Sequence, residues 1–435
     1  MSAATDPHPQ PLASARKLLA SGEPARAIQL VARVLRDDPD AREAYELAAE
    51  ALERQVGSGP QALLFRRCHE DFADPRSFYE LGFDFLSGDL PDLARPLLDR
   101  AFRLAPNDVA VRVEYAVALA ETGDHAAASR VLEELPAAAA GDRPSLVFLA
   151  AWCRLLTGDA DGAARGKERL DRLARSTPVD AMLRERLELG LERLRALGRP
   201  PGPQDLRGWH FVQYGGALLT TRAQAGTGGR YGVLVESFEA LGQRLAILIA
   251  LLRRLGLAVA RIATPAAQDA DILGRALAAR LHVPAVPWPT ADSPGDGTTL
   301  VCAASVDDLG APAALVRRAP TTVLYVHRLA WTRSAAVVPD VTGLMARVHF
   351  LPWGRTLQLD AASRRVFEQA ADPRPPAEIA AHVGALIPEP PAEDAAAVLA
   401  CYVRHRALSL YAGDERVTLR PGFRQESPVR SGPSC

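Results

Sequence analysis

Lysine is almost absent from this 435-residue sequence, which has it only at Lys17 and Lys167. Arginine therefore supplies nearly all of the positive charge, and arginine favours flat, bidentate ion pairs with carboxylate or phosphate groups. We attribute the bias to a GC-rich genome, which also explains the abundant alanine and the 34 prolines. The 51 basic and 52 acidic residues leave a net charge of −1, so no global field draws the chain to nucleic acid or to an anionic membrane.

Cysteine is scarce and scattered. None of the five cysteines forms a Cys-x-x-Cys pair, and their number is odd; they are Cys68, Cys153, Cys302, Cys401 and Cys435. This pattern fits neither a disulfide scaffold nor a zinc site, and it suits a reducing compartment. We expect no metal and no other cofactor.

Long apolar runs are also missing. The longest strongly apolar run, residues 245–252, is far shorter than the roughly 20 residues that span a bilayer. Residues 1–11 are polar and contain proline, without the basic and apolar regions of a secretory signal. We therefore expect a cytoplasmic protein that does not bind membranes.

A regular spacing of glycines is the clearest pattern that the sequence does contain. The glycines stand at intervals of 35, 31, 35 and 35 residues, and a small residue follows each within six positions. The glycines are Gly22, Gly57, Gly88, Gly123 and Gly158, and the small residues are Ala27, Ala62, Ala94, Ala128 and Ala163. A period near 34 residues is typical of a repeat made of two helices.

The third unit, residues 75–108, resembles the tetratricopeptide repeat. The family pattern of large, Leu, Gly, aromatic, Ala, large, Ala and Pro is matched by Phe78, Leu81, Gly82, Phe85, Ala94, Leu98, Ala101 and Pro106. Gly82 and Ala94 allow two helices to approach closely, and Pro106 ends the second helix. The second unit departs most from the pattern, around residues 56–64. The resemblance implies an α-solenoid of about five repeats over residues 10–197.

In such arrays the first helix of each hairpin lines a concave groove, so the resemblance also implies a binding surface. The groove positions place Arg76, Tyr79, Phe83, Phe148 and Trp152 on it. Exposed aromatic side chains on a concave surface are typical anchors for a partner helix or peptide. The alternative is that Phe148 and Trp152 pack against the next helix pair or against the second domain.

The second half of the chain has a different character. A Gly- and Pro-rich linker at residues 198–207 precedes two predicted strands, 210–219 and 231–235, which we expect to form a hairpin. The glycine-rich stretch 226–232 leads into a strand and not into a helix, so it does not indicate a phosphate-binding loop. Helix and strand patterns then alternate up to residue 355, which predicts a doubly wound, mostly parallel α/β domain over residues 208–355.

The remaining residues return to helical patterns. We predict helices over 361–370, 376–386 and 393–406 within a C-terminal helical segment, residues 356–423. Two short strands, 408–411 and 416–419, are a further possibility, and residues 424–435 have the composition of a disordered tail. The fold class is thus α plus α/β: a tetratricopeptide-type solenoid, then an α/β domain with C-terminal helices.

One segment of the α/β domain, residues 260–288, is weakly similar to the phosphoribosyltransferases. That family needs two adjacent acidic residues followed by a hydroxyl-bearing turn to hold a ribose phosphate. Asp307 and Asp308 are present, but Leu309, Gly310 and Ala311 replace the turn. The resemblance therefore implies a decayed catalytic site.

Open α/β sheets bind ligands beyond the carboxyl ends of their strands. That edge presents Asp307, Asp308, His327 and Arg328 as candidate ligand-binding residues. A histidine beside carboxylates is suited to acid–base chemistry. The alternative is that an aspartate caps the next helix and that His327, like His349 in a similar strand, has a structural role.

These observations favour an adaptor or scaffold that binds a protein or peptide and has no enzymatic activity. The alternative is an enzyme, or a sensor of a small ligand, that uses the α/β domain. No complete catalytic constellation stands at the predicted strand ends, so no catalytic residue is assigned. We expect no nucleic-acid partner, and a small-molecule ligand remains open.

Overall fold

A computed structural model describes residues 9–88, 90–135, 143–173, 177–220, 230–289, 297–310, 321–332, 334–359, 366–389 and 395–409. The chain divides into two compact units, Met1–Leu187 and Glu188–Cys435. Among the described residues, no helix is both long enough and apolar enough to cross a bilayer.

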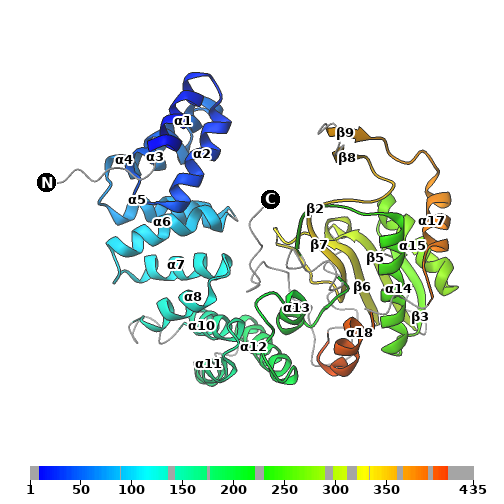
Figure 1. Ribbon diagram of the computed structural model, residues 1–435. Helices are drawn as coiled ribbons and strands as arrows, with labels where there is room; N and C mark the ends of the chain where they lie inside the picture. The colour runs from blue at the N-terminus through cyan, green and yellow to red at the C-terminus, as the bar shows by residue number, and fades with distance from the viewer. Residues whose placement is uncertain are drawn as a thin grey trace. The chain divides into compact units, whose positions relative to one another are not determined.

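The N-terminal unit contains five helical hairpins in its described part (Figure 1). The paired helices are α1 (Pro9–Ala20) with α2 (Pro24–Asp37), α3 (Arg42–Val56) with α4 (Pro60–Glu70), α5 (Pro75–Ser87) with α6 (Pro91–Leu104), α7 (Val109–Glu121) with α8 (His125–Glu133), and α10 (Pro144–Leu156) with α11 (Ala160–Leu173). A longer helix, α12 (Pro178–Ala196), follows them. This arrangement confirms the predicted solenoid.

The periodic small residues explain why the helices pair. Each of the five glycines lies in the turn between the two helices of one hairpin. The alanine that follows it is at most 1% exposed in every hairpin. At Gly82 a Cβ atom would stand 2.7 Å from Cγ of Leu98, so only glycine allows α5 and α6 to come this close.

Aromatic side chains fill the space between the second and third hairpins. The ring of Tyr45 contacts Phe65, Phe72 and Phe78 at centroid distances of 5.4–6.3 Å, mostly edge to face. The guanidinium of Arg100 lies 3.7 Å from the centroid of the Phe72 ring. These contacts extend the apolar core across neighbouring repeats, as a solenoid requires.

The C-terminal unit is built on a parallel sheet of seven strands within its described part. The strand order is β1-β7-β6-β5-β3-β4, and β2 also pairs with β7. The strands are β1 (Ala217–Leu218), β2 (Arg230–Val235), β3 (Val259–Thr264), β4 (Ala285–Pro287), β5 (Thr298–Ser305), β6 (Thr322–Leu329) and β7 (Val341–Phe350). The parallel pairing confirms the α/β fold class.

Alternate residues of the strands face two separate cores. On β5, Leu300 and Cys302 join the larger core, whereas Val301 and Ala303 join the smaller one. The helices α14 (Phe238–Arg254) and α15 (Gln268–Leu281) cover the face with the larger core (Figure 1). Residues two apart on one strand therefore share a face, which decides the partners of His327 below.

The predicted hairpin over residues 210–219 and 231–235 is wrong. A helix, α13 (Leu206–Tyr214), precedes β1, and both β1 and β2 pair in parallel with the same edge of β7. The side chain of Asp205 caps the start of α13, and Gly215 ends it in the left-handed conformation. All residues from 208 to 214 are buried, so no amphipathic pattern distinguishes the helix from a strand.

The helix predicted over residues 361–370 is also wrong in its described part. Strand β9 (Val366–Gln369) pairs in antiparallel fashion with β8 (Thr356–Leu359), so a partner strand overrides the local helical preference. Helices α17 (Pro376–Ala385) and α18 (Ala395–Arg404) agree with the predicted pattern. The predicted strands 408–411 and 416–419 and the tail 424–435 lie wholly or mostly outside the described residues.

Candidate functional site

Helix α5 presents three of the residues predicted to line the groove. The rings of Tyr79 and Phe83, one helical turn apart, stack at a centroid distance of 6.0 Å. Phe83 is 45% exposed, whereas Tyr79 is half-buried. The exposed side chain of Arg76 pairs with Glu80, with 2.7 Å between Nε and Oε1. The aromatic pair therefore offers an accessible apolar surface, and Arg76 already has an acidic partner.

A half-buried carboxylate lies close to this aromatic pair. Glu114 of α7 is near enough to Tyr79 that its charge, after burial, helps to raise the pKa of the tyrosine. Burial also raises the pKa of Glu114 itself. No ion pair of Glu114 is present among the described residues. A cationic side chain placed here would find an unneutralised acid.

Phe148 and Trp152 are placed differently. Their rings stack at 5.6 Å, but the two residues are only 7% and 1% exposed. The guanidinium of Arg186 on α12 lies 4.4 Å from the Trp152 ring and 5.8 Å from the Phe148 ring. A cation over an aromatic face is an attractive contact. The helix after the last hairpin thus contributes Arg186, which covers these rings.

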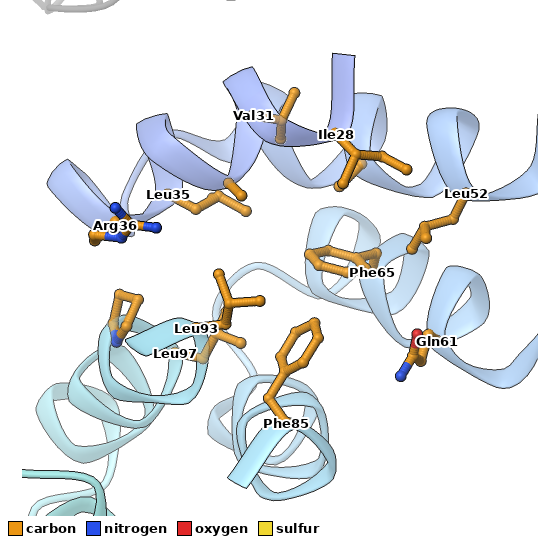
Figure 2. Close-up of a pocket in the computed structure, with 13 residues that line it drawn as sticks. Ile28, Val31, Leu35, Arg36, Leu52, Gln61, Phe65, Phe85, Leu93 and Leu97 are labelled. Atoms are coloured by element: carbon orange, nitrogen blue, oxygen red, sulfur yellow. The ribbon is translucent and has the colours of Figure 1, made fainter. Parts of the chain in front are cut away.

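A separate apolar pocket opens among the first three hairpins (Figure 2). It lies between α2, α3, α4, α5 and α6, and neither Tyr79 nor Phe83 lines it. Phe65 and Phe85 point into it from below α2 in Figure 2, and Leu35 faces them from α2. The second repeat, whose sequence departs most from the family pattern, contributes Ala48, Leu52, Gln61 and Phe65 to the lining of the pocket.

The four residues predicted at the ligand edge of the sheet do not form one cluster. Asp307 and Arg328 lie 3.7 Å apart, and Nη2 of Arg328 donates to Oγ of Ser305 at 2.8 Å. The carboxylate of Asp308 accepts from the backbone N–H of Ser305, which closes a capping box on the short 3-10 helix Val306–Leu309. Asp308 therefore has a structural partner, although Ser305 and not an aspartate is the N-cap residue of this short helix.

His327 faces the other side of the sheet and meets a second group of polar residues. Its Nε2 lies 2.6 Å from Oε2 of Glu236, and Nε2 of His349 lies 3.0 Å from the same oxygen. The three side chains are 0%, 1% and 4% exposed for His327, Glu236 and His349. Glu236 directly follows β2, while the histidines lie near the ends of β6 and β7, so the group occupies the carboxyl edge of the sheet.

Further residues form hydrogen bonds with His327 and Glu236 and fix their orientation. The hydroxyl of Tyr325 lies 2.8 Å from Nδ1 of His327, and Arg244 of α14 donates twice to Oε1 of Glu236, each time at 3.1 Å. Gly343 makes room for this arrangement, because a Cβ atom there would stand 2.5 Å from the carbonyl oxygen of His327 and 3.1 Å from Tyr325 Oη. Tyr325 and His327 share one face of β6 because they stand two residues apart, and this face meets Gly343 of β7 and Arg244 of α14.

Charge within the group is set by opposing effects. Burial raises the pKa of Glu236, but its contacts with His327, His349 and Arg244 outweigh this effect and hold that pKa well below its usual value. Burial lowers the pKa of His327 despite the adjacent carboxylate. At neutral pH His327 is therefore neutral beside an ionised Glu236 carboxylate, which forms an ion pair with Arg244.

Sequence reasoning identified His327 but missed its partners. Glu236 was overlooked because it stands 91 residues from His327 and forms no motif with it. Arg244 also belongs to no motif and directly precedes the apolar run 245–252. The usable signal was its position within a buried helix, because a charged residue is almost never fully buried without a partner.

Comparisons with known proteins are confined to the repeats. The tetratricopeptide repeat model matches residues 89–153. Among solved structures, YrrB, described as a TPR protein with an unusual peptide-binding site, is 20% identical with a TM-score of 0.26, over 40% of this chain and 88% of that one. MamA AMB-1 has the same identity and score over 40% and 94%. TTC0263, a thermophilic TPR protein of Thermus thermophilus, is 19% identical with a TM-score of 0.24, over 41% and 95%.

No curated protein sequence matches the chain. The family model runs from α6 of the third hairpin to α10 of the fifth and includes the buried Ala94 and Ala128. Arrays of such hairpins serve in general as adaptors for protein interaction. The residues that this family model matches lie in the N-terminal unit, whose paired helices fit a tetratricopeptide-type solenoid.

Proposed function

We propose that the repeat array binds a basic, apolar segment of a partner protein on the surface around Tyr79 and Phe83. The observation that carries the proposal is the stacked aromatic pair with Phe83 45% exposed. Large aromatic side chains dominate binding energies, because their burial removes much apolar area from water. Such a pair is costly to leave exposed unless something covers it.

The charge beside the pair selects the partner. Glu114 is half-buried and has no ion pair in the described part of the chain, so a lysine or arginine of the partner would recover its desolvation cost. The expected ligand is thus a helix or an extended peptide with an apolar anchor next to a basic residue. Phe148 and Trp152 are not included in this surface, because Arg186 covers them.

A peptide-display selection against the full chain tests the proposal. We expect the enriched peptides to share an aromatic or aliphatic anchor flanked by lysine or arginine. The double variant Tyr79→Ala/Phe83→Ala, which truncates both aromatic anchors, should raise the dissociation constant at least thirtyfold, which corresponds to about 2 kcal/mol. Glu114→Gln should lower the affinity for basic peptides by about tenfold or less and should reduce the salt dependence of binding.

The matched control is Leu63→Ala, which removes another exposed apolar side chain, 54% accessible, from the neighbouring helix α4. It should leave the affinity unchanged. Equal binding of the peptides by the double variant and the unmodified chain would contradict the proposal. Enrichment of acidic peptides would contradict the role of Glu114.

A further inference from the structure

We propose that Glu236, His327 and His349 bind one divalent transition-metal ion. One ligand atom from each residue converges on the same point: Oε2 of the glutamate and Nε2 of both histidines. All three atoms lie within 4.8 Å of one another. Two imidazoles and one carboxylate form a ligand set typical of zinc and of non-haem iron(II).

The spacing of the ligand atoms suits a common ion. Ligands about 2.1 Å from one metal ion, at angles between 90° and tetrahedral, stand about 3.0–3.4 Å apart. The histidine nitrogens lie 2.6 and 3.0 Å from the carboxylate oxygen. These two separations need to grow by only a few tenths of an ångström to admit the ion, and the two Nε2 atoms already lie within 4.8 Å of each other.

The surrounding side chains orient the ligand atoms. Metal-binding histidines generally engage the other ring nitrogen in a hydrogen bond, and Tyr325 supplies this contact to Nδ1 of His327. Arg244 occupies Oε1 of Glu236, so that only Oε2 points toward the histidines. The carboxylate would therefore bind through one oxygen, with at least one coordination position left for water or a further ligand.

The position within the fold agrees with a ligand site. The three residues come from the ends of β2, β6 and β7, at the carboxyl edge where open parallel sheets bind ligands. The sequence offered no indication of it, because no two of the three residues stand close together in the chain. The competing explanation is a closed hydrogen-bond network, which uses the same nitrogen and oxygen lone pairs and therefore excludes the ion.

Metal titration of the full chain distinguishes the two explanations. The purified protein is stripped with a chelator and titrated with zinc chloride against a chromophoric competitor, and bound zinc is counted by elemental analysis. We expect one zinc per chain. Glu236→Gln and His349→Gln keep the size of each side chain but weaken the ligand set, and each should raise the dissociation constant at least tenfold. His382→Gln, which changes a histidine on α17 outside the group, is the matched control and should bind zinc like the unmodified chain.

A second measurement does not depend on the variants folding. Cobalt(II) added to the unmodified chain should give the visible d–d bands of a nitrogen- and oxygen-ligated ion without a thiolate charge-transfer band. Zinc, but not an equal concentration of magnesium, should raise the unfolding temperature, because an ion that binds only the folded state stabilises it. No bound zinc, a thiolate band, or equal loss of zinc in His382→Gln would overturn the proposal.

Discussion

Gly82→Ala tests whether the close approach of α5 and α6 holds the repeat together. The new Cβ atom would stand 2.7 Å from Cγ and 3.0 Å from Cδ2 of Leu98, and 3.3 Å from Cβ of Leu97. Leu98 is completely buried, so its side chain has no free space to enter. Overpacking of this kind costs about 1–3 kcal/mol, while replacing glycine within a helix returns about 1 kcal/mol. We expect a net loss of up to about 2 kcal/mol.

A double-mutant cycle separates the clash from other effects. Leu98→Ala alone should cost about 2–5 kcal/mol, because it leaves a cavity in the core. In the Gly82→Ala background the added methyl group has room beside the shortened residue 98. The combined variant should therefore be about 1–3 kcal/mol more stable than the sum of the single changes.

Gly88→Ala is the matched control for the first change. A Cβ atom there meets only Asp84 O at 3.4 Å and Phe85 O at 3.5 Å, which are ordinary contacts. The free energies of local opening are measured by hydrogen exchange of the amides of α5 and α6 in the full chain. Additivity within about 0.5 kcal/mol, or equal stability of Gly82→Ala and Gly88→Ala, would refute the argument.

Three further predictions concern buried charge and close packing. Burial lowers the pKa of His210 to about 3, so this histidine stays neutral in the folded chain but becomes protonated below about pH 6.5 in the unfolded chain. The free energy of unfolding should therefore fall by up to about 5 kcal/mol as the pH drops from 6.5 toward 3. Urea titrations of His210→Gln should show a flatter pH profile. Arg100→Met removes the cation above the Phe72 ring and the hydrogen bond from Nη2 to the Phe72 carbonyl, so hydrogen exchange should show a loss of about 1–3 kcal/mol in the first three repeats, and an unchanged value would contradict the contact. Gly343→Ala places a Cβ atom 2.5 Å from the His327 carbonyl oxygen. Hydrogen exchange should show that the free energy of opening falls by about 1–3 kcal/mol in β6 and β7 but not in the repeats. An effect confined to the repeats would refute this placement of Gly343.

The repeat array could be predicted because its information is local. A glycine at each interhelical turn and an alanine five to six residues later recur with one period, and the packing of a hairpin needs only these neighbours. The exposure of groove residues was harder to predict. Phe83 and Trp152 occupy equivalent positions of their repeats, but only Trp152 meets the additional helix α12.

The α/β unit shows where local patterns fail. Its parallel pairing could be predicted from alternating helix and strand patterns. The partners of His327 could not, since they depend on which strand follows which in the sheet. Glu236 and His349 meet because β2 pairs with β7, a contact that joins residues 113 positions apart. Similarly, the helix α13 was mistaken for a strand because burial on all sides removes its periodicity.

The contact between α2 and α6 has a consequence for how the array comes apart. Helices in a simple solenoid touch only their immediate neighbours, so such arrays can fray one unit at a time from an end. Here a helix of the first hairpin touches one of the third, and a single apolar cluster runs from Leu12 to Ala118. Loss of the first hairpin would remove packing contacts from α6 as well as from α3. The first three hairpins and α7 should thus melt as one cooperative block.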